Sequence, residues 1–193
     1  MNNKRDAGID VAKGIGILLV IIGHEDIPSW FEDIIFSFHM PLFFILSGYF
    51  FKIENNQLIR IKKDARRLLL PYVVTMDVIT LYMLFIHQGI KHDGWYYITN
   101  SLWFWIYPTG APGGLNFSGP IWFLFALFWT KCSFNLIEHI HSKLRFILLT
   151  FIFLFPFVIY AHSRQSLPFS IYQGLTSLVF YWGGMNGKDM EIQ

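Results

Sequence analysis

Long stretches without a formal charge constrain the fold of this chain more than any other feature. Residues 34–51 contain no Asp, Glu, Lys or Arg, and residues 94–130 form a second such stretch of 37 residues. A helix of about 18 or more apolar residues is long enough to cross the hydrocarbon core of a bilayer. Charged residues make up only 15% of the chain, whereas soluble domains carry about 25%. The sequence therefore predicts an all-α, polytopic membrane protein.

The uncharged stretches predict a bundle of about six transmembrane helices. The expected spans are 7–24, 34–51, 68–90, 120–136, 146–162 and 168–184. A Pro- and Gly-rich stretch at 108–120 interrupts the longest uncharged run, so residues 95–107 are expected to form a re-entrant or interfacial segment. The chain shows no internal repeat or low-complexity tract. We therefore expect a single integral membrane domain over residues 1–193.

The distribution of charge predicts the orientation of these spans. Residues 52–67 include six basic side chains, whereas residues 25–33 include four acids and no base. Cytoplasmic loops of membrane proteins carry the excess of Lys and Arg. We therefore expect residues 52–67 and the N-terminus to be cytoplasmic, and residues 25–33 to lie on the outer side.

Lys13 and His24 lie in the first expected span and are separated only by uncharged residues. Eleven helical steps would place the two side chains within about 20° of each other around the helix, on one face, and about 16 Å apart along its axis. A neutral imidazole can accept a proton from a hydroxyl, and a lysine can hold a phosphate, a carbonyl or a developing oxyanion. The alternatives are structural: His24 ends the helix at the interface, and Lys13 snorkels while paired with Asp10. Titratable groups inside a membrane are costly, which favours a functional role for the aligned pair.

The second expected span carries another histidine and two hydroxyl groups beside a glycine. Ser47 and Tyr49 could bond a thioester or pantetheine group, and Gly48 permits the close approach of a ligand or of a neighbouring helix. Helix packing with satisfied hydroxyls explains the same residues equally well. His39 is expected to be structural when considered alone, or to join His24 on the outer side.

A basic segment that includes Lys63, Arg66 and Arg67 runs into the third expected span. Clustered Lys and Arg bind phosphates through charge-assisted hydrogen bonds, but they also serve as topology signals or contact anionic lipids. Asp77, inside the span, is explained by a polar contact between helices. Cys132 is the only cysteine, so neither a disulfide nor a cysteine-based metal site is expected.

Taken together, these segments resemble the acyltransferase-3 family of multi-pass membrane O-acyltransferases, in particular its fucose 4-O-acetylase-like branch. The matching segments, in family order, are 10–16 with 23–24, 38–44, 46–49, 63–68, 71–72 and 120–124. The first of them, in which a basic residue precedes a histidine by eleven positions, is the most diagnostic. Lysine stands at position 13 where arginine is commoner, and it keeps the charge but loses the planar fork.

The resemblance implies transfer of an acetyl or other short acyl group from cytoplasmic acyl-CoA to a carbohydrate hydroxyl of a cell-surface or secreted glycan. His24 would be the catalytic histidine and Lys13 its basic partner, with Asp10 and His39 supporting them. The acyl-CoA-binding residues would be Ser47, Gly48, Tyr49, Lys63, Arg66 and Arg67. Acetyl-CoA or another acyl-CoA is the expected donor, and no bound cofactor or metal is expected. The other expected partners are a carbohydrate or lipid-linked glycan acceptor and the lipid bilayer of the bacterial inner membrane, but not nucleic acid.

Family members of this type have more spans than this chain, so the chain is expected to be the N-terminal part of an acyltransferase-3-like domain. It would then be a truncated product, a fragment, or one half of an assembly that requires its missing C-terminal half or an oligomer partner. The alternative function is that of a non-catalytic membrane protein, acting as a carrier or as a partner subunit. The helix break at 108–120 would suit a transporter.

Overall fold

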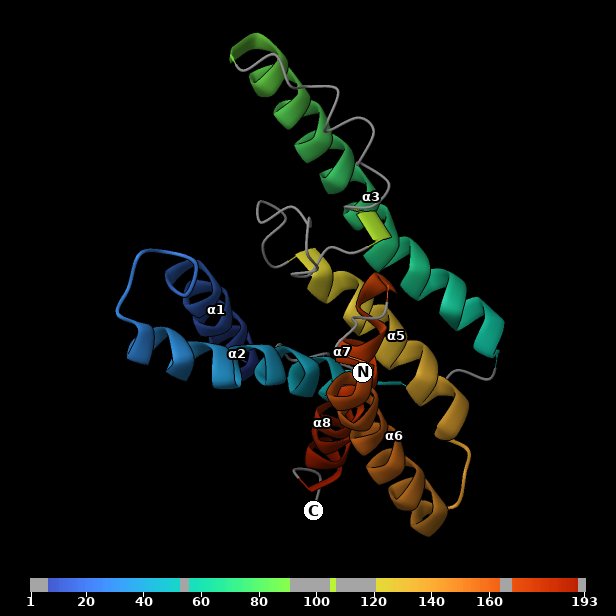
Figure 1. The fold of residues 1–193 in the computed structure, drawn as a ribbon. Coiled ribbons are helices and arrows are strands. Elements are labelled where there is room, and N and C mark those ends of the chain that lie inside the picture. The colour runs from blue at the N-terminus through green and yellow to red at the C-terminus, as the bar shows by residue number, and fades with distance from the viewer. Residues whose placement is uncertain (1–6, 53–55, 91–104, 107–120, 164–167, 191–193) are drawn as a thin grey trace. The chain divides into compact units, whose positions relative to one another are not determined.

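The computed structural model describes residues 7–52, 56–90, 105–106, 121–163 and 168–190. Every regular element in these ranges is helical, and they include no strand, which agrees with the expected all-α class. In chain order, the elements are α1 (Ala7–Ile22), α2 (Ser29–Tyr49), α3 (Gln57–Ile90), α5 (Trp122–Ile137), α6 (Ser142–Ser163), the 3₁₀ turn η2 (Pro168–Ser170), α7 (Ile171–Thr176) and α8 (Leu178–Met190) (Figure 1).

Packing divides these elements into two compact units. Unit 1 covers residues 1–53 and 177–193 and contains α1, α2 and α8, and unit 2 covers residues 54–176 and contains the other elements. The expectation of one domain over residues 1–193 stays a prediction.

Two of the described helices are long and apolar enough to cross a membrane. They are α2 (Ser29–Tyr49) and the portion Gln57–Ile86 of α3, while α5 is a shorter apolar helix. Two such helices do not demonstrate the expected set of about six, which stays a prediction. Most of the expected re-entrant segment 95–107 lies outside the described residues.

Several helices begin or end at positions other than the uncharged stretches indicate. The predicted second span begins at residue 34, but α2 begins at Ser29, and α3 already includes from Gln57 the basic segment expected to be a loop. Lys, Arg and Glu are good helix formers, so a helix continues past the point where its side chains become too polar for hydrocarbon. The last expected span, 168–184, is divided between η2, α7 and α8.

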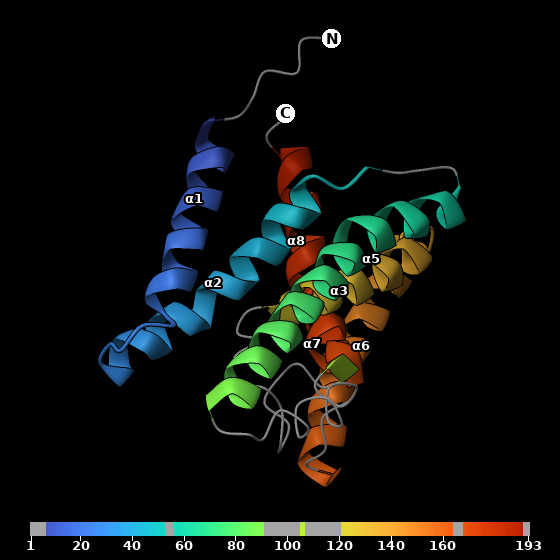
Figure 2. The same ribbon diagram turned by 90° about the horizontal axis from the view of Figure 1, so that it is seen from above.

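In unit 1, two glycines allow the backbones of α2 and α8 to touch where the helices cross (Figure 2). A Cβ atom on Gly48 would overlap the carbonyl oxygen of Tyr181, and one on Gly184 would overlap that of Ile45. Helices approach this closely only where small residues face each other. The contact therefore depends on both glycines having no side chain.

In unit 2, α5 is the central helix, and α3 and α7 both pack against it. The Thr130 hydroxyl of α5 lies 2.8 Å from the carbonyl oxygens of both Ala126 and Gly174, so it can donate to either of them. On the α3 side, the rings of Tyr72 and Phe125 meet edge to face with centroids 4.5 Å apart.

A strained turn connects η2 to α7. Phe169 and Ser170 both have φ of 54°, in the left-handed region, which costs a non-glycine residue about 1–2 kcal/mol. Ser170 is also buried, and its hydroxyl has no hydrogen-bond partner within the described residues. The turn therefore holds both backbone strain and an unsatisfied polar group.

We predict that Gly48→Ala and Gly184→Ala each destabilise unit 1 by about 1–3 kcal/mol, because the added methyl overlaps backbone atoms that cannot rotate away. Gly183→Ala is the matched control, since a Cβ there meets nothing within 4 Å. Thermal unfolding in detergent measures the difference. Equal melting temperatures for Gly184→Ala and Gly183→Ala would contradict the backbone contact.

We predict that Ser170→Gly stabilises unit 2 by about 1 kcal/mol, because glycine adopts positive φ without strain and removes the unsatisfied hydroxyl. The same substitution at Ser133, which lies inside α5, should destabilise the protein by about 1 kcal/mol through loss of helix propensity. Thermal unfolding distinguishes the two variants. A lower melting temperature for Ser170→Gly would show that the hydroxyl has a bonding role.

Candidate active site

His24 lies in a turn just beyond the end of α1, rather than inside the helix. Gly23 still bonds the carbonyl of Leu19, but the N–H groups of His24 and Glu25 donate to carbonyls three residues earlier, each at 3.1 Å. The helix thus tightens before it ends, a common feature of helix C-termini. The shared helix face expected for Lys13 and His24 therefore extends only as far as Ile22.

The imidazole of His24 is fixed by a bond to its own helix. Its Nδ1 atom lies 2.8 Å from the carbonyl oxygen of Val20. Because a carbonyl oxygen can only accept, Nδ1 must carry the proton and donate it, which leaves the Nε2 lone pair free in the neutral ring. The ring is exposed and meets the ring of Phe36 edge-on, with centroids 5.7 Å apart. The Nδ1–H tautomer of His24 would allow Nε2 to accept a proton as a general base.

His39 makes the same kind of bond at a buried position in α2. Its Nδ1–H donates to the carbonyl of Ile35 at 2.7 Å, and only 1% of the residue is exposed. Its ring is also packed on Phe36, with centroids 5.2 Å apart. The structure thus brings His24 and His39 to the same aromatic ring. A joint role for the two histidines on the outer side stays a prediction.

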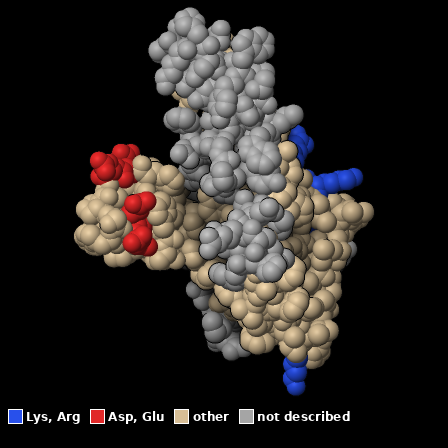
Figure 3. All heavy atoms as spheres, in the orientation of Figure 1, with Lys and Arg blue, Asp and Glu red and all other residues tan. Residues whose placement is uncertain are grey.

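Acidic side chains gather at the same end of unit 1 as His24 (Figure 3). Glu25, Asp26 and Asp33 are exposed in and beside the turn that joins α1 to α2. They form no ion pair with His24 within the described part of the chain. The imidazole therefore lies beside a negatively charged, solvated surface.

Lys13 lies near the opposite end of α2 from this turn. Its Nζ atom is 3.9 Å from a carboxylate oxygen of Asp10 and 4.2 Å from the ring centroid of Phe50. The expected pair with Asp10 is therefore present, and a cation–π contact places the ammonium beside the residue that follows Tyr49. Lys13 and His24 thus contact different ends of α2.

The motif Ser47-Gly48-Tyr49 forms the last residues of α2. Gly48 is buried against the backbone of Tyr181, so this face of the glycine contacts α8, as in the helix-packing alternative. Ser47 and Tyr49 are partly exposed, and the Tyr49 ring meets Phe50 edge-on. The binding of acyl-CoA by this motif stays a prediction.

The expected basic residues lie on α3, in unit 2, where the helix presents two different faces. Arg60 and Asp64 are buried toward α5, with Arg60 at 3.8 Å from Glu138 and Asp64 paired with Lys131. Lys63, Arg66 and Arg67 are exposed. The acid of this segment is thus neutralised inside the unit, and the expected phosphate-binding cations remain at the surface.

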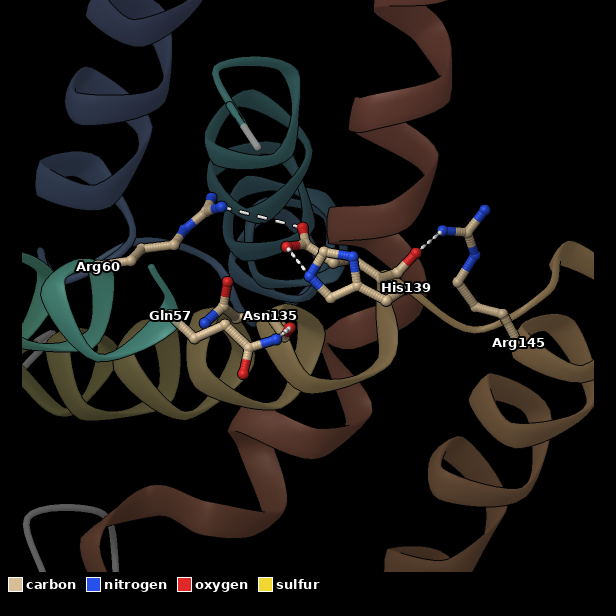
Figure 4. A network of polar contacts seen from close by, with 6 residues as sticks. Gln57, Arg60, Asn135, His139 and Arg145 are labelled. Atoms are coloured by element: carbon tan, nitrogen blue, oxygen red, sulfur yellow. Dashed lines mark hydrogen bonds and ion pairs between the residues drawn. The ribbon is translucent and has the colours of Figure 1, made fainter. Parts of the chain in front are cut away.

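A polar network, which the sequence did not indicate, surrounds the buried carboxyl group of Glu138 at the end of α5 (Figure 4). In addition to Arg60, His139 Nε2 lies 3.3 Å from the Glu138 carboxylate, and Arg145 donates to the Glu138 backbone carbonyl at 2.9 Å. The side-chain amide of Gln57 donates to the Asn135 carbonyl at 3.4 Å. The network ties the first turns of α3 to the end of α5 and the start of α6.

The charge state of Glu138 depends on this environment. Burial raises the pKa of its carboxyl above the ordinary 4.5, although Arg60, His139 and Arg145 each act to lower it. Its carboxylate oxygens are buried without a hydrogen bond among the described residues. Burial of a carboxyl group in such a site costs more free energy when the group is ionised than when it is protonated.

We predict that the stability of unit 2 falls as pH rises through the raised pKa of Glu138. The folded state binds this proton more tightly than the unfolded state, so the stabilisation is complete below pH 4.5 and is lost as the carboxyl ionises. Glu138→Gln cannot ionise and should show a flatter profile. Thermal unfolding in detergent from pH 4 to pH 8 checks this, and parallel curves for the two proteins would contradict it.

Comparison with known proteins identifies the family of this chain. A family model described as an acyltransferase domain, that of the acyltransferase-3 family, matches residues 6–190. The nodulation protein NolL of Mesorhizobium japonicum is 38% identical over 87 residues, an alignment that covers 36% of this chain and 22% of NolL. The chain thus matches less than a quarter of the length of that relative, and no solved structure matches it. Because the family model covers nearly the whole chain, the protein belongs to the acyltransferase-3 family of membrane acyltransferases.

Proposed function

We propose that this chain acts in a membrane O-acyltransferase that moves an acyl group, most simply acetyl, from cytoplasmic acyl-CoA to a carbohydrate hydroxyl. The acceptor would belong to a cell-surface or secreted glycan, free or lipid-linked. The observation that carries the proposal is the bond between His24 Nδ1 and the Val20 carbonyl. In the neutral ring this bond leaves the Nε2 lone pair available to accept a proton, which supports a role for His24 as a base in a chain that belongs to an acyltransferase family.

The reaction follows from that tautomer. Nε2 of His24 takes the proton of the acceptor hydroxyl as its oxygen attacks the thioester carbonyl carbon. The carbon–sulfur bond then breaks, and the leaving thiolate of CoA takes the proton from the imidazolium. The products are the sugar ester, free CoA and neutral His24. In a second route, His24 itself carries the acyl group before the sugar oxygen attacks.

Lys13 supplies positive charge at the other end of α2. The Asp10 carboxylate and the Phe50 ring hold its ammonium in place, and an oriented cation can stabilise the phosphates or the developing negative charge of the donor. We assign it to the donor side of the reaction. His39, packed on the same Phe36 ring as His24, supports the position of the catalytic imidazole.

The exposed cations of α3 are suited to the phosphates of acyl-CoA. Lys63, Arg66 and Arg67 project from a helix whose only acid in this segment, Asp64, is already paired with Lys131. The guanidinium group of an arginine can donate two parallel hydrogen bonds to the oxygens of one phosphate. With these residues and the N-terminus on the cytoplasmic side of a bacterial inner membrane, the donor would meet them first.

We predict that His24→Ala lowers the rate of acyl transfer by about 10²–10⁴-fold, because the general base is lost. His141→Ala removes an exposed imidazole at the start of α6 and should leave the rate unchanged. Transfer of labelled acetyl groups from acetyl-CoA to membrane glycans measures both rates, and immunoblots of membranes verify equal insertion.

Retained transfer in His24→Ala would refute the role of this histidine. A wild-type chain that neither binds acetyl-CoA nor transfers acetyl groups would favour the non-catalytic alternative, in which the chain is a carrier or a partner subunit.

A further inference from the structure

Asp77 is the only charged residue between positions 68 and 90, and it lies within the portion of α3 that is long and apolar enough to cross a membrane. Its side chain is exposed, and within the described part of the chain it forms no hydrogen bond or ion pair. The polar contact between helices that the sequence suggested is therefore not present among these residues. A carboxylate at this depth is costly unless a partner supplies donors, which makes a functional role the first hypothesis.

The position of Asp77 relates it to the basic residues of the same helix. It lies eleven positions after Arg66, so the two are within about 20° of each other around the helix and about 16 Å apart along its axis. Tyr72, Met76 and Met83 are buried on the other side of α3. One exposed face of α3 thus carries phosphate-binding cations at one end and a carboxylate three turns deeper.

Apolar side chains occupy the face between these two charges. Leu70, Val73 and Val74 are 55%, 38% and 53% exposed. A ligand that fits the whole face carries phosphates at one end, an apolar middle, and hydrogen-bond donors about 16 Å further on. A phospholipid has the phosphate and the apolar chains but no donor at that depth.

We propose that the Asp77 carboxylate accepts hydrogen bonds from amide N–H groups in the pantetheine arm of the acyl-CoA donor. This inference rests on the proposed function and adds a binding residue to it. The arm is as long as four or five extended peptide units, about 15 Å, and it carries a dimethyl group between the phosphates and its amides. The amides lie nearer to the phosphates than the end of the arm does, and the length of the arginine side chain accommodates this difference from the roughly 16 Å between the two backbone positions. Arg66 then holds the phosphates, the apolar residues contact the dimethyl group, and Asp77 fixes the amides, so that the thioester is held at a defined depth.

The test compares two ligands that differ only in this arm. Coenzyme A contains the arm, whereas 3′-phospho-ADP retains its nucleotide and phosphates but lacks the arm. Loss of a hydrogen bond to a charged group weakens binding by about tenfold to a hundredfold. We predict that Asp77→Leu weakens binding of coenzyme A by this factor and leaves binding of 3′-phospho-ADP unchanged, as titrations of the full chain in nanodiscs would show.

Two control variants make the result specific. Thr75→Leu is also a change from a polar to an apolar side chain at an exposed position of α3. Thr75 lies about 160° away from Asp77 around the helix, so this variant should alter neither affinity. Arg66→Gln should weaken both ligands. Since leucine favours membrane insertion over aspartate, Asp77→Leu is not expected to fail through misfolding.

The outcomes separate this inference from the proposed function. If the wild type binds coenzyme A and Asp77→Leu binds it equally well, the role of Asp77 is refuted while the proposed donor stands. Equal weakening of both ligands by Asp77→Leu would also refute it, because the effect would not involve the arm. A wild type that binds neither ligand would overturn the proposed donor and this inference with it.

Discussion

The arrangement of unit 2 depends on the ion pair between Asp64 of α3 and Lys131 of α5, which lies largely away from water. Arg60, on the same side of α3, faces the carboxyl group of Glu138. Because a buried charge without a partner is strongly destabilising, the need to pair Asp64 fixes the rotation of α3 about its own axis. Once Arg60 and Asp64 face inward, helical geometry places Lys63 and Arg66 outward. The cationic surface proposed for the donor is thus a consequence of how the unit hides its only acid in that segment.

The sequence predicted the parts of this structure that follow from local composition. Uncharged stretches located the two long apolar helices, and the spacing of Asp10 and Lys13 predicted their ion pair. The sequence could not predict where the helices begin. The absence of charge shows which residues can lie in hydrocarbon, whereas helix propensity decides where a helix starts, and the two properties are separate. The sequence also missed Glu138, whose partner Arg60 comes from α3, an element distant in the sequence that meets the end of α5 only after folding. No local pattern distinguishes such an acid from a solvated one.

The candidate site shows a similar division between local and tertiary information. The spacing to Lys13 identified His24 as a candidate, but the environment of its ring depends on the turn that ends α1. There the backbone offers the Val20 carbonyl to Nδ1, and His39 finds the carbonyl of Ile35 in the same way inside α2. Both histidines therefore have Nε2 as the basic nitrogen without help from another side chain. For Gly48, the sequence allowed close approach of either a ligand or a neighbouring helix. The structure shows a contact with the backbone of Tyr181 in α8, which only the tertiary fold could reveal.

The same spacing occurs twice along the chain. Lys13 precedes His24 by eleven positions, and Arg66 precedes Asp77 by the same interval. In α3 the interval is helical throughout and corresponds to about 16 Å, whereas α1 ends at Ile22 and His24 lies in the turn beyond it. A polar group within an apolar helix that crosses a membrane must find its hydrogen-bond partner in the protein or in a ligand. His24 bonds the Val20 carbonyl through Nδ1, and Nε2 remains available. Asp77 has no such partner in the described part of α3, and for this reason an amide-bearing ligand accounts for its position better than the helix alone.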